Sequence, residues 1–319
     1  MNSCFLSCDW GSTSFRIYMV DSKSGAVLAN ASSSKGIAWA NSAFLQTGEA
    51  SGKRAAFFSS IIQQHIEEMK SSGAQLPSNA PVLLSGMASS NIGMVQLPYA
   101  RLPFSCNGEA LLTHTVRMGD GTSRDIVIIS GVRTEDDVMR GEETQLLGAV
   151  ADGVTDGLFL FPGTHSKHIT VAAGKAVHFD TFMTGELFQL LATHSMLSGS
   201  IAVNEDLDDA LHKSAFASGV AKAKELPLLH SLFTTRTNQL LKDMAATANY
   251  HYLSGLLIGA ELAGINGEQQ RITIAAAPGL LKRYQLALSI LVPDAGIISL
   301  EAVRATIRGH QMLYKKLYG

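Results

Sequence analysis

Hydrophobic and polar residues alternate, or apolar residues run between turn residues, in three short stretches near the start of the chain. These are residues 4–8, 15–21 and 26–32. A period of two places successive side chains on opposite faces of a sheet, so the pattern predicts three antiparallel strands. Apolar residues then recur at helical spacing from Lys53 to Ser72, which predicts an amphipathic helix.

Two apolar runs without polar alternation follow, Pro81–Leu84 and Ile126–Ile129. Short β-branched or leucine-rich runs of this kind are typical of strands that are buried on both faces, and we expect both to be parallel strands. A helix is predicted from about Arg140 to Ala151.

The same order of elements begins again in the second half of the chain. The predicted strands here are 158–161, 168–172 and 176–182, followed by a helix at about 185–196 and a mostly helical region at roughly 206–264. The remaining predicted elements are a strand at 272–276, a helix near 280–291, a short strand at 297–300 and a terminal helix from Glu301.

Two units of three strands followed by helices predict an α/β fold with two lobes. We expect residues 1–152 to form the first lobe and residues 153–319 the second, with a turn-like hinge at 152–157 and with the terminal helix able to pack back on the first lobe. Two lobes placed in this way leave a cleft, where ligands commonly bind.

Composition excludes several classes of function. The 319 residues are 46% hydrophobic and 16% charged, with a net charge of −2 and no basic block. Nucleic acid is therefore an unlikely partner, since binding its backbone needs concentrated Lys and Arg. The most apolar helical stretch, 253–265, is too short to span a bilayer, and the beginning of the chain is unlike a signal peptide. We expect a cytoplasmic protein that binds no membrane.

The common sequence motifs of nucleotide-binding proteins and hydrolases are imperfect or absent. Residues 48–54 imitate a Walker A loop but are one residue short, with Arg54 where Ser or Thr must reach magnesium. The sequence contains no G-x-G-x-x-G after a strand, no H-E-x-x-H and no G-x-S-x-G. Dinucleotide, zinc-hydrolase and serine-esterase functions lose their usual support.

Two small-residue turns at strand ends are the first candidates for chemistry. The turn at Asp9–Thr13 offers Gly11 for close approach of the backbone to a ligand, and a carboxylate that can hold Mg²⁺ through water. An ordinary hairpin turn explains this stretch equally well when it is taken alone. The turn at 161–167 occupies the equivalent place in the second half, and it adds two hydroxyls and Lys167. Two such turns facing each other would clamp a triphosphate.

A pair of carboxylates, Glu142 and Glu143, opens the helix between these turns. The pair can simply complement the helix dipole. At the edge of a cleft, one of the two could instead accept the proton of a hydroxyl that attacks a γ-phosphate.

Two further polar segments are candidates for binding a polyol. The loop at 85–93 contains Ser89, Ser90 and Asn91, and an ordinary polar loop is an equally good interpretation. A helix begins at 184–188, where Thr184 is a natural N-cap. The backbone N–H groups of the first turn of this helix could also face a ligand.

Taken together, these motifs resemble the 2-dehydro-3-deoxygalactonokinase family of sugar-acid kinases, within the actin/hexokinase/heat-shock ATPase superfamily. The resemblance covers nearly the whole chain, and VMRGEETQLLGA and PGTHSK are its most specific motifs. The matching stretches are DWGSTSFR (9–16), GMASSNIG (86–93), VMRGEETQLLGA (138–149), PGTHSK (162–167), FMTGELF (182–188) and SGLLIGAEL (254–262).

The resemblance implies two ribonuclease-H-like lobes that close over ATP, Mg²⁺ and a sugar acid, the first lobe on the sugar-acid side and the second on the nucleotide side. It implies transfer of the γ-phosphoryl group to the 6-hydroxyl of 2-dehydro-3-deoxy-D-galactonate, in galactonate breakdown. Alternatives are a kinase of another sugar acid or polyol, and a catalytically weak sugar-acid-binding protein. A homodimer is one assembly open to such a protein.

The resemblance also implies roles for individual residues. One of Glu142 and Glu143 would be the base, and Asp9 would hold Mg²⁺. Ala277-Pro278 stand where the superfamily's adenosine loop usually offers Gly-Thr or Gly-Gly. The residues implied in phosphate and ATP binding are Gly11, Ser12, Thr13, Gly163, Thr164, His165, Ser166, Lys167, Gly255 and Gly279. The residues implied in substrate binding are Arg16, Ser89, Ser90, Asn91, Arg140, Thr184, Gly185 and Glu186.

Overall fold

The computed structural model describes residues 4–119, 124–151, 153, 156–265 and 271–319. The chain divides into two compact units. The first unit comprises Met1–Thr155, Ala172–His178 and Val303–Gly319, and the second comprises Asp156–Val171 and Phe179–Ala302. The chain therefore returns to the first unit twice after leaving it. The sequence predicts a boundary after residue 152 and allows the return of the terminal helix, but it does not predict the return of residues 172–178.

The first unit contains a mixed sheet with the strand order β3-β2-β1-β4-β8-β7. The first three strands are antiparallel, and β1 pairs in parallel with β4, which pairs in parallel with β8, so the predicted strand directions are confirmed. The strands are β1 (Cys4–Trp10), β2 (Phe15–Asp21), β3 (Val27–Ser33), β4 (Val82–Gly86), β7 (Thr113–Arg117) and β8 (Asp125–Ile129). The strand β7 was not predicted, because its side chains are mostly exposed and it contains only one aliphatic residue.

Helices complete the first unit: α1 (Ile37–Gln46), α2 (Arg54–Ser71), α3 (Glu142–Ala151) and α10 (Ala302–Tyr318). The apolar side of α2, which includes Phe58 and Ile62, is buried in one core with alternate side chains of β1. Cys4 and Cys8 lie in this core, buried and outside any disulfide, where cysteine packs as a small apolar residue.

A small sheet, β10-β9-β5, lies beside the main one in the first unit. Its strands are β5 (Ala100–Arg101), β9 (Val132–Arg133) and β10 (Val138–Met139). Another two-residue strand, β6 (Phe104–Ser105), pairs with the beginning of β13 at Lys175 and Ala176. None of these strands was predicted, because two residues are too few to show a period.

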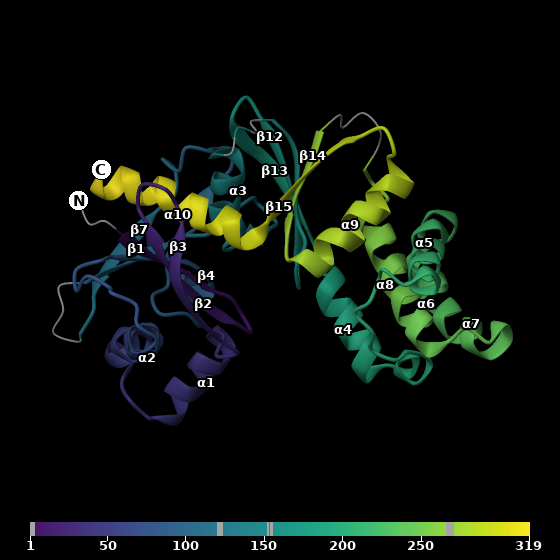
Figure 1. The fold of residues 1–319 in the computed structure, drawn as a ribbon, viewed down its shortest axis with the longest axis horizontal. Helices are drawn as coiled ribbons and strands as arrows, with labels where there is room; N and C mark the ends of the chain where they lie inside the picture. Colours follow the sequence, from purple (N-terminus) through teal and green to yellow (C-terminus); the bar gives the residue numbers. More distant parts are fainter. Residues whose placement is uncertain (1–3, 120–123, 152, 154–155, 266–270) are drawn as a thin grey trace. The chain divides into compact units, whose positions relative to one another are not determined.

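The second unit is built on the strands β15-β14-β11-β12-β13. These are β11 (Gly157–Phe161), β12 (Ser166–Ala172), β13 (Lys175–Phe182), β14 (Arg271–Ala276) and β15 (Gly296–Glu301). The helices α4–α9 are grouped on one side of this sheet in Figure 1. They are α4 (Thr184–His194), α5 (Ala210–Glu225), α6 (Leu228–Leu232), α7 (Thr234–Lys242), α8 (Ala246–Leu262) and α9 (Pro278–Leu291).

Glycines allow α5 and α8 to cross with their backbones in contact. A Cβ atom at Gly255 would clash with the carbonyl oxygen of Phe216, and one at Gly219 would clash with that of Tyr252. Gly255 thus lies at a helix crossing, in a helix that is buried nearly all round. This packing explains why the apolar pattern of α8 is continuous rather than amphipathic.

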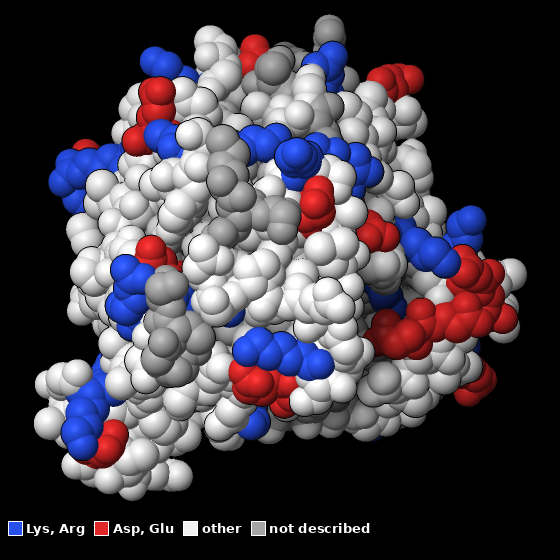
Figure 2. Space-filling view, turned by 60° about the vertical axis from the view of Figure 1, so that its left-hand side comes forward, with Lys and Arg blue, Asp and Glu red and all other residues white. Residues whose placement is uncertain are grey.

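No helix in the described part of the chain combines the length and apolar character needed to cross a bilayer. Charged side chains of both signs are interspersed on the face of the molecule shown in Figure 2, without a continuous basic field.

Glycines also seat α10 against α3 inside the first unit. A Cβ atom at Gly309 would clash with the carbonyl oxygen of Thr144, and one at Gly148 would clash with that of Ala305. The N-terminal turn of α3, which carries the two glutamates, is therefore held in place by the last helix of the chain.

Substituting Gly309→Ala should lower the free energy of unfolding by about 1–3 kcal/mol, because a methyl group cannot fit between the two backbones. Denaturant unfolding measures the change. The matched control is Gly52→Ala, since a Cβ atom at Gly52 would meet nothing within 4 Å. Equal losses of stability in the two variants would contradict the close crossing.

Candidate active site

The turn after β1 is fixed by backbone hydrogen bonds to the beginning of α1. The N–H of Gly11 donates to Ser14 O at 2.9 Å, and the N–H of Ile37 donates to Gly11 O at 2.9 Å. A side chain at position 36 would clash with Ser12 O, so Gly36 is needed there. Ser12 and the next residue, Thr13, remain exposed. The turn therefore presents two hydroxyls on a rigid loop, although the N–H of Gly11 is already used within it.

Asp9 lies at the end of β1, beside the end of β4. Its Oδ2 lies 3.4 Å from Nη1 of Arg16, and its side chain is 23% exposed. Burial raises the pKa of Asp9, and the charge of Arg16 acts in the opposite direction. Gly86 follows Ser85, the register partner of Asp9, and its φ of +89° suits glycine. A Cβ atom there would lie 2.7 Å from Trp10 O and 3.3 Å from Asp9 Oδ1, so Asp9 packs directly over a bare backbone.

The two glutamates begin α3 next to the same glycine. A Cβ atom at Gly141, whose φ is +107°, would lie 3.5 Å from the Cα atom of Gly86. Gly86 is thus close to both Asp9 and the turn that leads to Glu142 and Glu143. The ends of β1 and β4 and the start of α3 therefore meet at one place in the first unit.

The environments of the two glutamates differ. Glu143 is 1% exposed, accepts the N–H of Gly141 at 2.7 Å and accepts the hydroxyl of Thr144 at 3.1 Å. Burial, followed by the charge of Glu142, raises the pKa of Glu143 to about 8. Glu142 is only partly buried. At neutral pH the buried member of the pair therefore holds a proton, and Glu142 is the more exposed member.

The loop after β4 is held by Arg54, for which the sequence predicted no structural role. Arg54 Nε donates to Gly93 O at 2.6 Å, and Nη2 donates to Asn41 Oδ1 at 2.7 Å. In this loop the hydroxyl of Ser90 donates to Met87 O at 2.7 Å, while Asn91 is exposed. The buried hydroxyl of Ser89 accepts Nη1 of Arg140 at 2.6 Å, which joins two of the predicted substrate-binding residues.

In the second unit, the turn between β11 and β12 packs against the beginning of α4. A Cβ atom at Gly185 would clash with Gly163 O, and the N–H of Glu186 donates to Thr164 O at 3.0 Å. The side chain of Glu186 also hydrogen-bonds to Nε2 of His165. The predicted residues 163–167 and 184–186 therefore form one cluster. Within it, Thr164 and His165 are exposed, whereas Ser166 and Lys167 are buried.

A buried hydrogen-bond network supports this turn through Ser166. The sequence did not predict this network. Ser166 Oγ lies 3.0 Å from the hydroxyl of Tyr284, which donates to Glu261 Oε2 at 2.6 Å. The other oxygen of Glu261 lies 2.9 Å from Nε2 of His168. Burial and the adjacent carboxylate raise the pKa of Tyr284 well above its usual value. The network links the turn to α8 and α9.

A cavity of about 350 Å³ opens in the second unit, next to the start of α4. Thr184 and Gly185 line one part of it, and apolar side chains of α4, α8 and α9 line much of the rest. The full lining consists of Thr184, Gly185, Phe188, Glu205, Tyr250, Ser254, Leu257, Ile258, Ala277, Gly279, Leu280, Arg283 and Tyr284. Gly255 is not part of this lining, although its neighbour Ser254 is.

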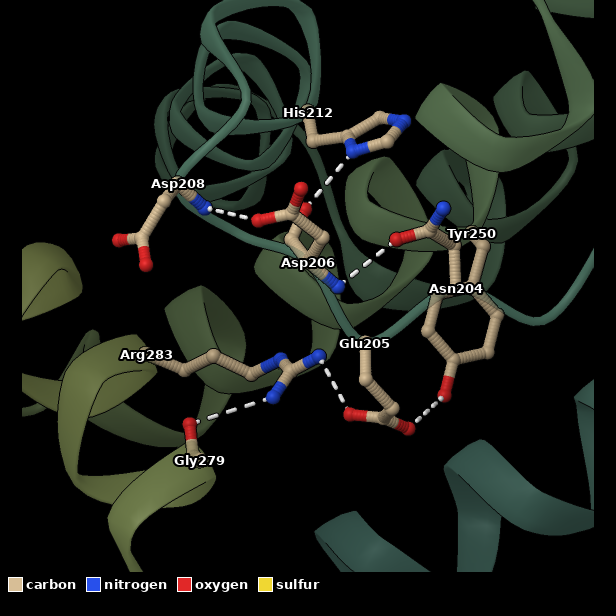
Figure 3. Close-up of polar contacts among 8 residues, drawn as sticks. All are labelled: Asn204, Glu205, Asp206, Asp208, His212, Tyr250, Gly279 and Arg283. Carbon is tan, nitrogen blue, oxygen red and sulfur yellow. Dashed lines mark hydrogen bonds and ion pairs between the residues drawn. The ribbon is translucent and has the colours of Figure 1, made fainter.

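Two of the polar residues that line the cavity, Glu205 and Arg283, form an ion pair, which is drawn in Figure 3. Nη2 of Arg283 lies 3.0 Å from Oε2 of Glu205, and the hydroxyl of Tyr250 donates to the other oxygen at 3.0 Å. The side chain of Arg283 is 6% exposed and that of Glu205 is 72% exposed. Burial and the charge of Glu205 raise the pKa of Tyr250 to about 12. Glu205 lies in a loop without a recognisable motif, so only the structure identifies it.

Ala277 and Pro278 stand at the start of α9, beside this cavity, where the missing backbone N–H of proline breaks no hydrogen bond within the helix. Pro278 is the first residue of α9, where an N–H has no partner within the helix, so proline is tolerated. Ala277 and Gly279 both line the cavity, and the carbonyl of Gly279 accepts Nη1 of Arg283 at 3.2 Å.

Replacing the buried acid by Glu143→Gln should make stability less dependent on pH. The folded-state pKa of about 8 lies above the ordinary value of 4.5, so the stabilisation by protonated Glu143 is present below pH 4.5 and is lost as the pH rises to 8. In that window the wild type should lose up to about 1.4 kcal/mol per pH unit relative to the variant. Denaturant unfolding at pH 5 and pH 8 measures this difference, and parallel pH profiles would contradict the assignment.

Comparison with known proteins gives a consistent result. The model of the family described as 2-keto-3-deoxy-galactonokinase matches residues 9–312. The chain is 34% identical over 316 residues to a protein of Rhizobium meliloti (strain 1021) named probable 2-dehydro-3-deoxygalactonokinase, with 94% of each chain covered. It is 32% identical over 309 residues to the 2-dehydro-3-deoxygalactonokinase of Escherichia coli (strain K12), again with 94% of each covered.

A crystal structure is also similar to this chain. It is that of a Sinorhizobium meliloti protein provisionally assigned as a 2-dehydro-3-deoxygalactonokinase, with a TM-score of 0.82 and 30% identity. The match covers 98% of this chain and 97% of that one.

Proposed function

The chain belongs to the 2-keto-3-deoxy-galactonokinase family, and from this premise we propose how its residues transfer a phosphoryl group. The protein is a phosphotransferase that uses ATP to phosphorylate a hydroxyl of a keto-deoxy sugar acid. The finer proposal is that the substrate is 2-dehydro-3-deoxy-D-galactonate and that the acceptor is its 6-hydroxyl. The observation that carries the proposed mechanism is the pair Glu142 and Glu143, whose environments separate their protonation states beside Asp9.

Glu142 is the general base in this mechanism. It is the more exposed member of the pair, whereas Glu143 is buried and hydrogen-bonded to the turn on which Glu142 stands. The carboxylate of Glu142 takes the proton of the acceptor hydroxyl as the oxygen attacks the γ-phosphorus, and ADP leaves with the bridging oxygen. Glu143 is a positioning residue that fixes Gly141.

Asp9 is the residue that would hold Mg²⁺. In the described ranges no group of three or more His, Cys, Asp or Glu side chains is arranged to bind a metal ion. A single partly exposed carboxylate fits Mg²⁺, because this ion keeps several waters and takes its other ligands from substrate phosphates. When bound, the ion would neutralise charge on the phosphate oxygens. The neighbouring hydroxyls of Ser12 and Thr13 would bind the same phosphates.

The second unit would hold the nucleotide. The turn at 163–167 and the cavity meet at Thr184 and Gly185, so a ligand with a phosphate end and an apolar ring end fits both parts. We place the phosphates at Thr164 and His165 and the nucleoside in the cavity, where Glu205 and Arg283 supply the polar groups. The reaction itself takes place in the cytoplasm in this proposal, and a homodimer remains a prediction.

Substituting Glu142→Gln should lower kcat by roughly 10²–10⁴-fold, because the general base is lost while the shape of the side chain is kept. Steady-state kinetics with ATP and the sugar acid measure the effect. Glu143→Gln is the matched control and should keep most of kcat, since an amide can still accept the N–H of Gly141. A larger loss in the control would assign the base to Glu143 instead.

A panel of sugar acids and polyols tests the reaction. An ADP-release assay should give the highest kcat/KM with 2-dehydro-3-deoxy-D-galactonate and much lower values with its epimer and with neutral polyols. Mass spectrometry of the product should place the phosphate on the 6-oxygen. Preference for a neutral polyol would favour the alternative of a polyol kinase, and binding of sugar acids without turnover would favour a binding protein.

A further inference from the structure

The small sheet β10-β9-β5 brings three residues that are distant in the sequence to the same end of the sheet. Ala100 pairs in parallel with Val132, and Val132 pairs antiparallel with Met139. The residues that adjoin these pairs on one side are Tyr99, Gly131 and Arg140. Their juxtaposition is thus fixed by the strand register.

The side chain of Arg140 is held in one orientation at this end of the sheet. Its guanidinium lies 4.0 Å from the centre of the Tyr99 ring, and Nε donates to the hydroxyl of Tyr99 at 3.1 Å. A Cβ atom at Gly131 would lie 2.6 Å from Cγ of Arg140 and 3.1 Å from Cε1 of Tyr99. Glycine at 131 therefore gives the two side chains the space in which they stack. On the other side, Nη1 of Arg140 donates to Ser89 Oγ at 2.6 Å.

The partners of this partly buried cation are neutral. Among the described residues, no carboxylate lies within ion-pair distance of Arg140, and the two hydroxyls engage only two of the five N–H donors of its guanidinium. Arg16 and Arg117 in the same unit are instead paired with Asp9 and Asp125. A partly desolvated guanidinium that lacks an anion, but is fixed in position, is arranged to receive one.

We propose that Arg140, positioned by Tyr99, Gly131 and Ser89, binds the carboxylate of the sugar acid and selects acids over neutral sugars. This assignment rests on the proposed function and adds to it the group that recognises the acid end of the substrate. Arg140 stands two residues before Glu142, so the same turn carries the anchor for the carboxylate and the base for the hydroxyl. A planar guanidinium whose face is covered by a tyrosine ring keeps its edge for two parallel hydrogen bonds, which suits a carboxylate.

Calorimetry with two probes tests the proposal without requiring turnover. The probes are 2-dehydro-3-deoxygalactonate and its C1 amide, which lacks the charge. Wild type should bind the acid more tightly than the amide, and Arg140→Met should weaken binding of the acid about 10- to 100-fold while changing that of the amide little. Tyr99→Phe, which removes one hydrogen bond to Arg140 but keeps the ring, should have a smaller effect in the same direction.

Arg133→Met is the matched control. Arg133 lies on the same small sheet, and its substitution removes the same charge. It should keep the preference for the acid. Unchanged acid binding in Arg140→Met, or an equal loss in Arg133→Met, would overturn the proposal. A loss of ATP affinity in Arg140→Met with acid binding intact would also overturn it and would assign the guanidinium to a phosphate. If wild type shows the expected binding but phosphorylates no sugar acid, the carboxylate site stands and the kinase mechanism fails.

Discussion

The close approach of backbones at Gly86 is the constraint on which the first-unit site depends. A positive φ and the absence of a side chain let the end of β4 lie against Trp10 and Asp9 on one side and near Gly141 on the other. The carboxylate at the end of β1 and the carboxylates at the start of α3 are thereby brought together from segments more than a hundred residues apart. Any larger residue at position 86 would clash with Trp10 O and move Asp9 away from the start of α3.

Electrostatics then gives chemically similar residues different tasks. Glu142 and Glu143 are adjacent, yet burial and the neighbouring Glu142 raise the pKa of Glu143 to about 8, so that only the environment of the second favours a retained proton. The two arginines of the same region also differ, because Arg16 faces Asp9 whereas Arg140 is held by a ring and two hydroxyls. In both cases the environment, rather than the type of residue, decides which groups can act on a substrate.

Much of this arrangement could be predicted from the sequence, and the parts that could not be predicted were missed for physical reasons. Long periodic elements such as β1 and α2 were predicted, as were the clusters around Asp9 and Gly163, because glycines and hydroxyls at strand ends are a local signal. Tyr99 and Glu205 were missed, since each gains its role from partners far along the chain, Arg140 and Arg283. The helix α1 was missed although its first N–H groups hold the turn at Asp9–Thr13 in place. Gly255 was assigned to ATP from its motif, whereas the structure places it at a helix crossing that no local pattern reveals.

The position of α10 has a consequence for how the protein is made. This helix supports the first turn of α3, yet more than a hundred residues of the second unit lie between the two in the chain. During synthesis the sheet of the first unit can form early, but the segment carrying Glu142 lacks its support until α10 has left the ribosome. The second unit is therefore largely an insertion within the first, and the segment carrying Glu142 should reach its final packing only after α10 has been made.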